Sequence, residues 1–210
     1  MMIFLANIGN TAYAQGPIRV ACIGDSITEG SGYPADLQKM LGENYTVGNF
    51  GVSGSAVSTK AIKPYITQYE FWRAINFQPD IVVIMLGTND ANIDAYQDIN
   101  HFQENYKSLI SKFEELPGNQ QIILVEPPPI LNNTLSLSND NLVQGVIPNI
   151  DQIANDLNLT TVNVYDALVN HNEVFGDGVH PNLDGGQIIA EQISEGIDFY
   201  DPNYYAPGFP

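Results

Sequence analysis

Residues 18–28 decide the fold, and they read Ile18-Arg19-Val20-Ala21-Cys22-Ile23-Gly24-Asp25-Ser26-Ile27-Thr28. The first six form a short apolar run rich in β-branched types, which predicts a buried strand that ends at Gly24. A serine, Ser26, therefore lies at the carboxyl end of a strand. In an open parallel sheet ligands bind at that end, because the strand tips and the helices after them open there into a crevice.

Four more strands are expected along the chain, at residues 45–50, 81–86, 121–125 and 160–164. Helical patterns lie between them or after them, at residues 33–41, 68–75, 100–115, 143–157 and around 189–197. Pro148 should kink or divide the fourth of these helices. Strands that alternate with helices predict an α/β fold, a three-layer α/β/α sandwich with a flavodoxin-like five-stranded parallel sheet.

A length of 210 residues suits one domain of this kind, which we place at residues 16–200. Residues 201–210 are expected to form a C-terminal tail. Residues 1–15 are interpreted as a signal remnant or an N-terminal extension. Their apolar start and Ala12-Tyr13-Ala14 favour a secreted or periplasmic protein, whereas the lack of Lys or Arg before Arg19 favours a cytoplasmic one.

The chain is strongly acidic, with seven Lys and Arg against 24 Asp and Glu and a net charge of −17. Such a field disfavours nucleic acid, anionic membrane surfaces and polyanionic substrates, so a neutral small-molecule or glycan partner is expected. No run after residue 15 approaches the roughly 18 apolar residues of a membrane span, and no stable membrane association is predicted. These patterns leave the oligomeric state open.

Polar or glycine-containing clusters directly follow the first three predicted strands, and they contain Ser26, Gly51 and Asn89. Because the carboxyl ends of parallel strands meet at one edge of a sheet, we expect these residues to lie close together. A fourth cluster places Asp177 three residues before His180, and side chains with this spacing in a turn can face each other.

Several other polar residues have a simpler interpretation. Asp25 and Asp90 are expected to be helix caps or loop anchors, with a direct catalytic role as the alternative. Cys22 is interpreted as a small buried hydrophobe. His101 and His171 are expected to be solvated or capping histidines.

The sequence predicts neither a catalytic metal nor a cofactor. A single cysteine excludes a multi-cysteine metal site, and the acidic residues show no ordered ligand pattern. Glu126, at the end of the fourth predicted strand, either lines the pocket or meets a backbone amide.

Together the clusters resemble the SGNH hydrolases, the GDSL-type esterase and lipase superfamily. The four sequence blocks of that family occur in order over about residues 18–200, as Gly24-Asp25-Ser26-Ile27, Asn49-Phe50-Gly51, Gly87-Thr88-Asn89-Asp90 and Asp177-Gly178-Val179-His180-Pro181. Ile27 stands where many members carry leucine, an apolar residue of similar volume.

The resemblance implies that Ser26 is a nucleophile, His180 its general base and then general acid, and Asp177 the group that orients the imidazole. It also implies three oxyanion donors, namely the backbone N–H groups of Ser26 and Gly51 and the side-chain amide of Asn89. The chemistry agrees, because a serine hydroxyl needs an imidazole held in one tautomer to remove its proton.

The function expected from these residues is that of a serine esterase, acting on short acyl groups such as acetyl, on carbohydrate, through an acyl-serine intermediate. Polar residues in the loops after the third and fourth strands favour sugar hydroxyls, and these residues are Asn92, Asp94, Tyr96, Gln97, Asp98, Asn132, Asn133, Ser136, Ser138 and Asn139. The alternative is a narrow acyl-binding slot lined by Leu131, Leu135 and Leu137.

Other functions remain open at this stage. A lipase, lysophospholipase, thioesterase or acyltransferase of the same superfamily uses the same intermediate. A catalytically silent carbohydrate-binding relative is the alternative of another class. The intact set of Ser26, Asp177, His180 and Asn89 argues against the silent relative.

Overall fold

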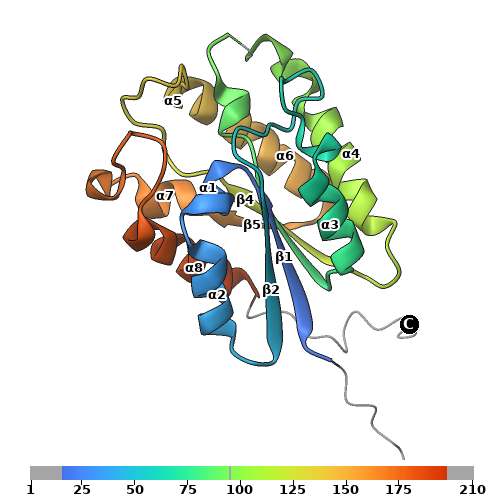
Figure 1. The fold of residues 1–210 in the computed structure, drawn as a ribbon. Helices are drawn as coiled ribbons and strands as arrows, with labels where there is room; N and C mark the ends of the chain where they lie inside the picture. The colour runs from blue at the N-terminus through green and yellow to red at the C-terminus, as the bar shows by residue number, and fades with distance from the viewer. Residues whose placement is uncertain (1–15, 95, 198–210) are drawn as a thin grey trace, which may run out of the picture.

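A computed structural model describes residues 16–94 and 96–197, without the side chains of Gln97 and Asp98. These residues form one sheet with helices on both faces (Figure 1). The predicted leader or extension at residues 1–15 and the predicted tail at residues 201–210 lie outside the described residues. Within the described part of the chain, no helix is long and apolar enough to cross a membrane.

The five strands are all parallel and follow the order β2-β1-β3-β4-β5, which confirms the predicted flavodoxin-like sheet. The strands are β1 (Ile18–Gly24), β2 (Tyr45–Gly51), β3 (Ile81–Met85), β4 (Gln121–Glu126) and β5 (Thr160–Asn163). Gly24 is in register with Gly51 on one side and with Met85 on the other. The tips of β2, β1 and β3 therefore end level with one another.

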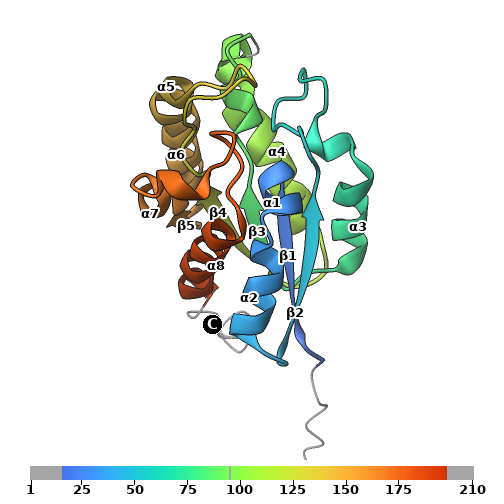
Figure 2. The ribbon, with the colours of Figure 1, turned by 60° about the vertical axis from the view of Figure 1, so that its left-hand side comes forward.

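The helices lie in two layers (Figures 1 and 2). One layer holds α1 (Ser26–Gly30), α2 (Tyr33–Leu41), α7 (Val164–Leu168) and α8 (Leu183–Ile197). The other holds α3 (Tyr69–Phe77), α4 (Phe102–Glu114) and α6 (Ile147–Leu157), with α5 (Asn139–Asn141) near the start of α6. Short helical turns complete the chain at η1 (Tyr65–Thr67), η2 (Asn89–Ala91), η3 (Tyr96–His101), η4 (Leu142–Val146) and η5 (Asn172–Val174).

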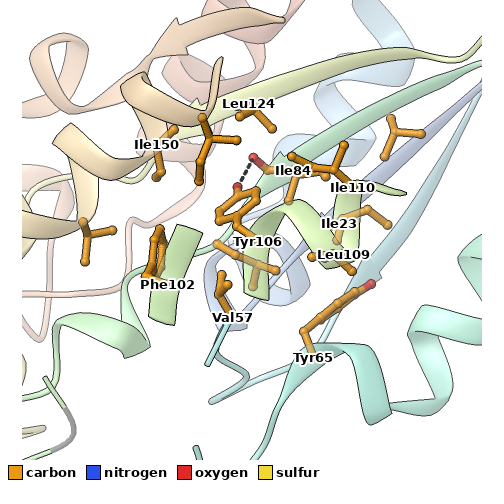
Figure 3. Packing of buried hydrophobic residues seen from close by; sticks show 14 of the residues in the cluster. Ile23, Val57, Tyr65, Ile84, Phe102, Tyr106, Leu109, Ile110, Leu124 and Ile150 are labelled. Carbon is orange, nitrogen blue, oxygen red and sulfur yellow. Dashed lines mark hydrogen bonds between the residues drawn. The ribbon is translucent and has the colours of Figure 1, made fainter. Parts of the chain in front are cut away.

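Two apolar cores separate the sheet from its helical layers. Along β1, Ala21 and Ile23 belong to the core under α3, α4 and α6, and Val20 and Cys22 belong to the core under α2 and α8. Figure 3 shows the first core, in which Tyr106 of α4 lies among aliphatic side chains and donates its hydroxyl hydrogen to the carbonyl oxygen of Ile84 at 3.4 Å. A strand covered on both faces explains why the apolar runs are nearly continuous.

The structure departs from the expected elements at three places. The helix expected from residue 143 begins as a π-helical turn, η4, and becomes α-helical at Ile147. Pro148 is the second residue of α6, and helical structure continues without a break from α5 through η4 into α6, so the expected kink or division is seen only as this change from π to α geometry.

The other two departures are short helices that lie outside the expected helical ranges, α1 and α7. Each follows a strand directly and is capped by the side chain before it. Asp25 accepts the N–H of Ile27 at 2.9 Å, and Asn163 accepts the N–H of Asp166 at 2.8 Å. The second helix ends β5 one residue earlier than predicted.

Candidate active site

Ser26 is the first residue of α1, immediately beyond the tip of β1. The chain turns sharply there, and a Cβ at Gly24 would overlap the Thr28 hydroxyl and lie 2.8 Å from the carbonyl oxygen of Met85. Only glycine fits this position. The turn therefore places the serine hydroxyl at the edge of the sheet where β1, β2 and β3 end.

A hydrogen-bonded chain of three side chains joins Ser26 to the turn before α8. Ser26 Oγ lies 2.8 Å from His180 Nε2, and His180 Nδ1 lies 2.6 Å from Asp177 Oδ2. Because an ionised carboxylate only accepts, the proton between them belongs to Nδ1, and Nε2 is left to accept the serine proton. The structure thus brings the three predicted residues together in the expected order.

Asp177 is held as a carboxylate. Its Oδ1 accepts the backbone N–H groups of Val179 at 2.9 Å and of His180 at 2.8 Å. Partial burial acts to raise the pKa of Asp177, but the hydrogen bonds from the His180 backbone, its imidazole and Val179 outweigh it and lower the pKa to about 2. The group that orients the imidazole is therefore charged at any ordinary pH.

Asn89 begins η2, four positions after the last residue of β3, and its side chain faces the same edge. The Nδ2 group donates to the carbonyl oxygen of Ser55 at 2.9 Å and to Asp25 Oδ2 at 3.2 Å. Both amide hydrogens therefore have partners in this structure. The bond to Asp25 is the longer of the two.

Asp25 is buried beneath this site, with 1% of its surface exposed. Burial raises its pKa to about 7, and the nearby charge of Asp90 adds to the shift, while the N–H of Ile27, the charge of His180 and the hydroxyl of Thr88 oppose it. Asp25 caps α1 as predicted, and it also holds Asn89.

Gly51 corrects one prediction. Its backbone N–H donates to Asn49 Oδ1 at 2.9 Å, so it is not a free donor for an oxyanion. A Cβ at Gly51 would overlap the backbone of Glu29 in α1. Glycine is needed here because β2 and α1 pack closely, and the N–H serves the loop rather than the site.

Sequence reasoning missed Gly54, three residues further on. Ser55 donates its N–H to the carbonyl oxygen of Val52 at 3.0 Å, which closes a turn in which Gly54 has φ +74°. Among the hydrogen bonds of the described residues, none uses the exposed Gly54 N–H. The glycine precedes Ser55, whose carbonyl oxygen holds Asn89. The signal was the Ser53-Gly54 pair, which is typical of a turn with a positive φ.

Asp90 anchors the loop that carries Gly54, as predicted. Its carboxylate is buried and accepts the N–H groups of Val57 at 2.9 Å and Ser58 at 2.8 Å. Because Asp90 follows Asn89, the loop after β2 is attached to the start of η2.

Comparisons with known proteins identify the family of this chain. A family model described as the GDSL-like Lipase/Acylhydrolase family matches residues 22–188. The chain belongs to this family. It is also 31% identical over 224 residues to an acetylxylan esterase of Xylanibacter ruminicola, a match that covers 92% of this chain and 47% of the relative. The chain thus spans about half the length of that curated relative.

Solved structures of other esterases have the same fold as this GDSL family member. A carbohydrate acetylesterase from Sinorhizobium meliloti superposes with a TM-score of 0.73 at 17% identity, covering 86% of this chain and 98% of the other. An acetylxylan esterase from Geobacillus stearothermophilus superposes with a TM-score of 0.69 at 24% identity, covering 88% and 96%.

In this GDSL domain the loop after β4 packs against the turn that carries Asp177 and His180. Leu131 donates its N–H to the carbonyl oxygen of Gly178 at 2.7 Å, and a Cβ at Gly178 would overlap the carbonyl oxygen of Asn132. An open depression of about 410 Å³ lies there, beside Asp177, and its lining comes from Leu131, Asn132, Asn133, Thr134, Phe175, Gly176, Asp177 and Gly178.

Some of the polar loop residues expected to face sugar hydroxyls serve the GDSL domain itself. Asn133 Nδ2 donates to the carbonyl oxygens of Leu131 and Leu137, and its Oδ1 accepts the N–H groups of Leu135 and Leu137. Asn139 accepts the N–H of Ile130 and donates to the Tyr165 hydroxyl of α7, and Ser138 accepts the N–H of Asn141 in α5. Asn132, Thr134 and Ser136 are exposed, and the first two line the depression.

The remaining candidates lie away from the triad. Cys22 is fully buried in β1, and burial raises the pKa of its thiol to about 12. His101 and His171 are partly exposed beside Glu104 and Glu173 respectively. Their interpretation as solvated histidines is confirmed.

Glu126 is buried near Asp151 of α6 and Asp166 of α7. Burial, and then the nearby charges of these two carboxylates, raise its pKa to about 7. Within residues 16–94 and 96–197, no group of three or more His, Cys, Asp or Glu side chains is placed to hold a metal ion. The absence of a catalytic metal stays a prediction.

Proposed function

We propose that this chain is a serine esterase that removes short acyl groups, above all acetyl, from neutral carbohydrate esters. The observation that carries the proposal is the continuous chain of hydrogen bonds from Ser26 through His180 to Asp177. A serine in that arrangement is activated for attack on an acyl carbon.

The reaction follows the proton along this chain. His180 Nε2 takes the hydroxyl proton as Ser26 Oγ bonds to the acyl carbon, and the imidazolium then gives that proton to the departing sugar oxygen. Water attacks the acyl-serine with His180 again as base, and the carboxylic acid leaves as Ser26 regains its proton. Asp177 stays ionised throughout and orients the imidazole.

The oxyanion of the tetrahedral intermediate is proposed to bind to three donors. These are the backbone N–H of Ser26 in the first turn of α1, the amide of Asn89, and the N–H of Gly54 in place of Gly51. Losing one such donor typically costs about a hundredfold to a thousandfold in turnover.

The substrate class rests on three observations. The relative from Xylanibacter ruminicola is an acetylxylan esterase, and the two solved structures are a carbohydrate acetylesterase and an acetylxylan esterase. A net charge of −17 repels phospholipid surfaces and uronate polymers. The depression beside Asp177 is open and lined in part by Asn132 and Thr134, which suits a hydroxyl-bearing leaving group better than a long acyl chain.

A fluorophosphonate probe and an ester panel test the proposal. We expect the probe to label the wild type at Ser26 and to leave Ser26→Ala unlabelled. Specificity constants should fall from acetyl to butyryl to octanoyl p-nitrophenyl esters, and acetylated xylo-oligosaccharides should be deacetylated.

Other outcomes would assign other functions. Preference for octanoyl esters without deacetylation of any sugar would identify a lipase-like enzyme. A folded protein that the probe does not label would indicate a carbohydrate-binding relative. Transfer of the acyl group to an added sugar alcohol in preference to water would identify an acyltransferase.

A further inference from the structure

Ser53, the residue before Gly54, is held from both sides by oppositely charged side chains. Glu29 Oε2 accepts the N–H of Ser53 at 2.9 Å, and Lys63 Nζ donates to the carbonyl oxygen of Ser53 at 2.9 Å. Glu29 belongs to α1, the helix that begins at Ser26. The two bonds therefore attach this turn both to the helix of the nucleophile and to the far end of its own loop.

The turn leaves one peptide group unused. Gly54 has φ +74° and Ser53 has no positive φ, which is the combination of a type II turn over residues 52–55. Its closing bond uses the groups of Val52 and Ser55. The central peptide consists of the Ser53 carbonyl and the Gly54 N–H, and only the carbonyl has a partner among the described residues, namely Lys63.

The orientation of this peptide decides where the Gly54 N–H points. In a trans peptide the carbonyl and the N–H point in opposite directions, so fixing one fixes the other. A type II turn differs from a type I turn by a flip of this central peptide, and glycine accepts both. The Lys63 ammonium, bonded to the Ser53 carbonyl oxygen, favours the type II orientation of the Ser53–Gly54 peptide. It also polarises this peptide, which makes the Gly54 N–H a stronger donor.

We propose that Lys63 is a positioning residue that orients the Gly54 N–H toward the oxyanion through the Ser53–Gly54 peptide. The inference rests on the proposed function and on the proposed role of Gly54. The backbone of Lys63 is itself fixed, because its carbonyl oxygen accepts the N–H of Ala56 at 3.0 Å. The side chain of Lys63 therefore extends to Ser53 from a backbone that is itself fixed by a hydrogen bond.

Lys63→Met tests the proposal, because it keeps the aliphatic stem and removes the ammonium. We expect kcat for p-nitrophenyl acetate to fall about tenfold, a part of the loss that follows removal of an oxyanion donor. KM should stay within twofold. The inhibition constant of phenylboronic acid, whose tetrahedral serine adduct places an oxygen in the same site, should rise about tenfold.

Three controls make the result specific. Lys63→Arg keeps a cationic donor and should restore kcat to within about threefold. Lys39→Met removes the same charge from α2, where Lys39 pairs with Asp36, and should leave kcat unchanged. Lys63→Gln is made alongside and should lose as much as Lys63→Met, with melting temperatures of both equal to that of the wild type.

The possible failures are distinguishable. A wild type that hydrolyses no ester overturns the proposed function, and the inference with it. An active wild type whose kcat and boronic acid affinity persist in both Lys63→Met and Lys63→Gln overturns the inference alone. An equal loss in Lys39→Met, or no recovery in Lys63→Arg, also overturns it, since a general charge effect or a packing effect would then account for the loss.

Discussion

Leu131 donates its backbone N–H to the carbonyl oxygen of Gly178 at 2.7 Å, so the loop after β4 is bonded to the turn that carries Asp177 and His180. The carbonyl oxygen of Asn132 packs directly against Gly178 on the same side. The triad geometry therefore depends on a segment that contributes no triad residue.

Gly178→Ala should show this dependence. Gly178 has φ +83°, and the added Cβ would overlap the carbonyl oxygen of Asn132, so the turn must shift. We expect the free energy of unfolding to fall by about 1–3 kcal/mol and kcat by at least about tenfold. Urea unfolding and ester kinetics measure both. Gly176→Ala is the matched control, because a Cβ added there would meet no atom within 4 Å beyond its chain neighbours and Gly176 has no positive φ; equal losses in the two variants would contradict the argument.

Ser26→Ala and His180→Ala should each lower kcat/KM for acetyl esters by about 10⁴-fold or more, because each removes an indispensable member of one proton-transfer unit. Asp177→Asn should lose a similar or smaller factor. Far-UV circular dichroism should be unchanged in all three. His171→Ala changes a histidine that pairs with Glu173 away from the site and should retain wild-type kinetics. Wild-type turnover in Ser26→Ala would refute the mechanism.

Asp90→Ala should loosen the loop after β2. The change leaves the N–H groups of Val57 and Ser58 without their carboxylate, at a cost of about 1–3 kcal/mol in stability. It should also lower kcat, since the same loop carries Ser55, which holds Asn89. Asp94→Ala, an exposed change shortly after η2, serves as the control for melting temperature and kinetics. Identical melting temperatures for the two variants would argue against an anchoring role.

Glu126→Gln should stabilise the protein selectively at alkaline pH. The folded-state pKa of Glu126 is raised to about 7, so the folded protein binds more protons than the unfolded chain, and stability falls as pH rises from about 4.5 to about 7. Glutamine is uncharged at every pH, as protonated Glu126 is. We expect the variant to exceed the wild type by about 1–3 kcal/mol at pH 8 and to match it at pH 4.5.

Urea midpoints at the two pH values measure this difference. The pKa of Asp25 is also raised to about 7, so Asp25 also makes the free energy of unfolding fall as pH rises. This contribution is the same in the wild type and in the variant. Glu43→Gln is the control, because Glu43 lies far from Asp151 in the sequence. This variant should show the same dependence of the free energy of unfolding on pH as the wild type. A Glu126→Gln variant with the full wild-type slope would show that the Glu126–Asp151 contact does not titrate as described.

The sheet could be predicted because buried parallel strands carry continuous apolar runs that end at glycine or polar residues, as β1 does at Gly24. The helices α1 and α7 could not be found in the same way, because five residues hold too little periodicity. Their caps, Asp25 and Asn163, were the available signal. The π-helical start before Pro148 depends on packing that no local pattern reports.

The triad could be predicted from the order and spacing of its blocks, whereas the choice between Gly51 and Gly54 could not. Both glycines follow the apolar part of β2. The Gly51 N–H is taken by the Asn49 side chain, and this contact cannot be read from the order of residues alone. Likewise the partner of Glu126 is Asp151, which lies 25 positions away in the sequence and becomes a neighbour only when α6 packs on the sheet.

Cys22, the chain's one cysteine, lies fully buried in β1 with its thiol protonated. Maleimides and iodoacetamides react with exposed thiolates, so they should leave the native fold unmarked. A cysteine introduced on the outer face of α3 or α4 would then be the one attachment point for a dye, a spin label or a solid support. Immobilisation on an insoluble glycan matrix or distance measurement by paired labels would require no prior removal of the native cysteine.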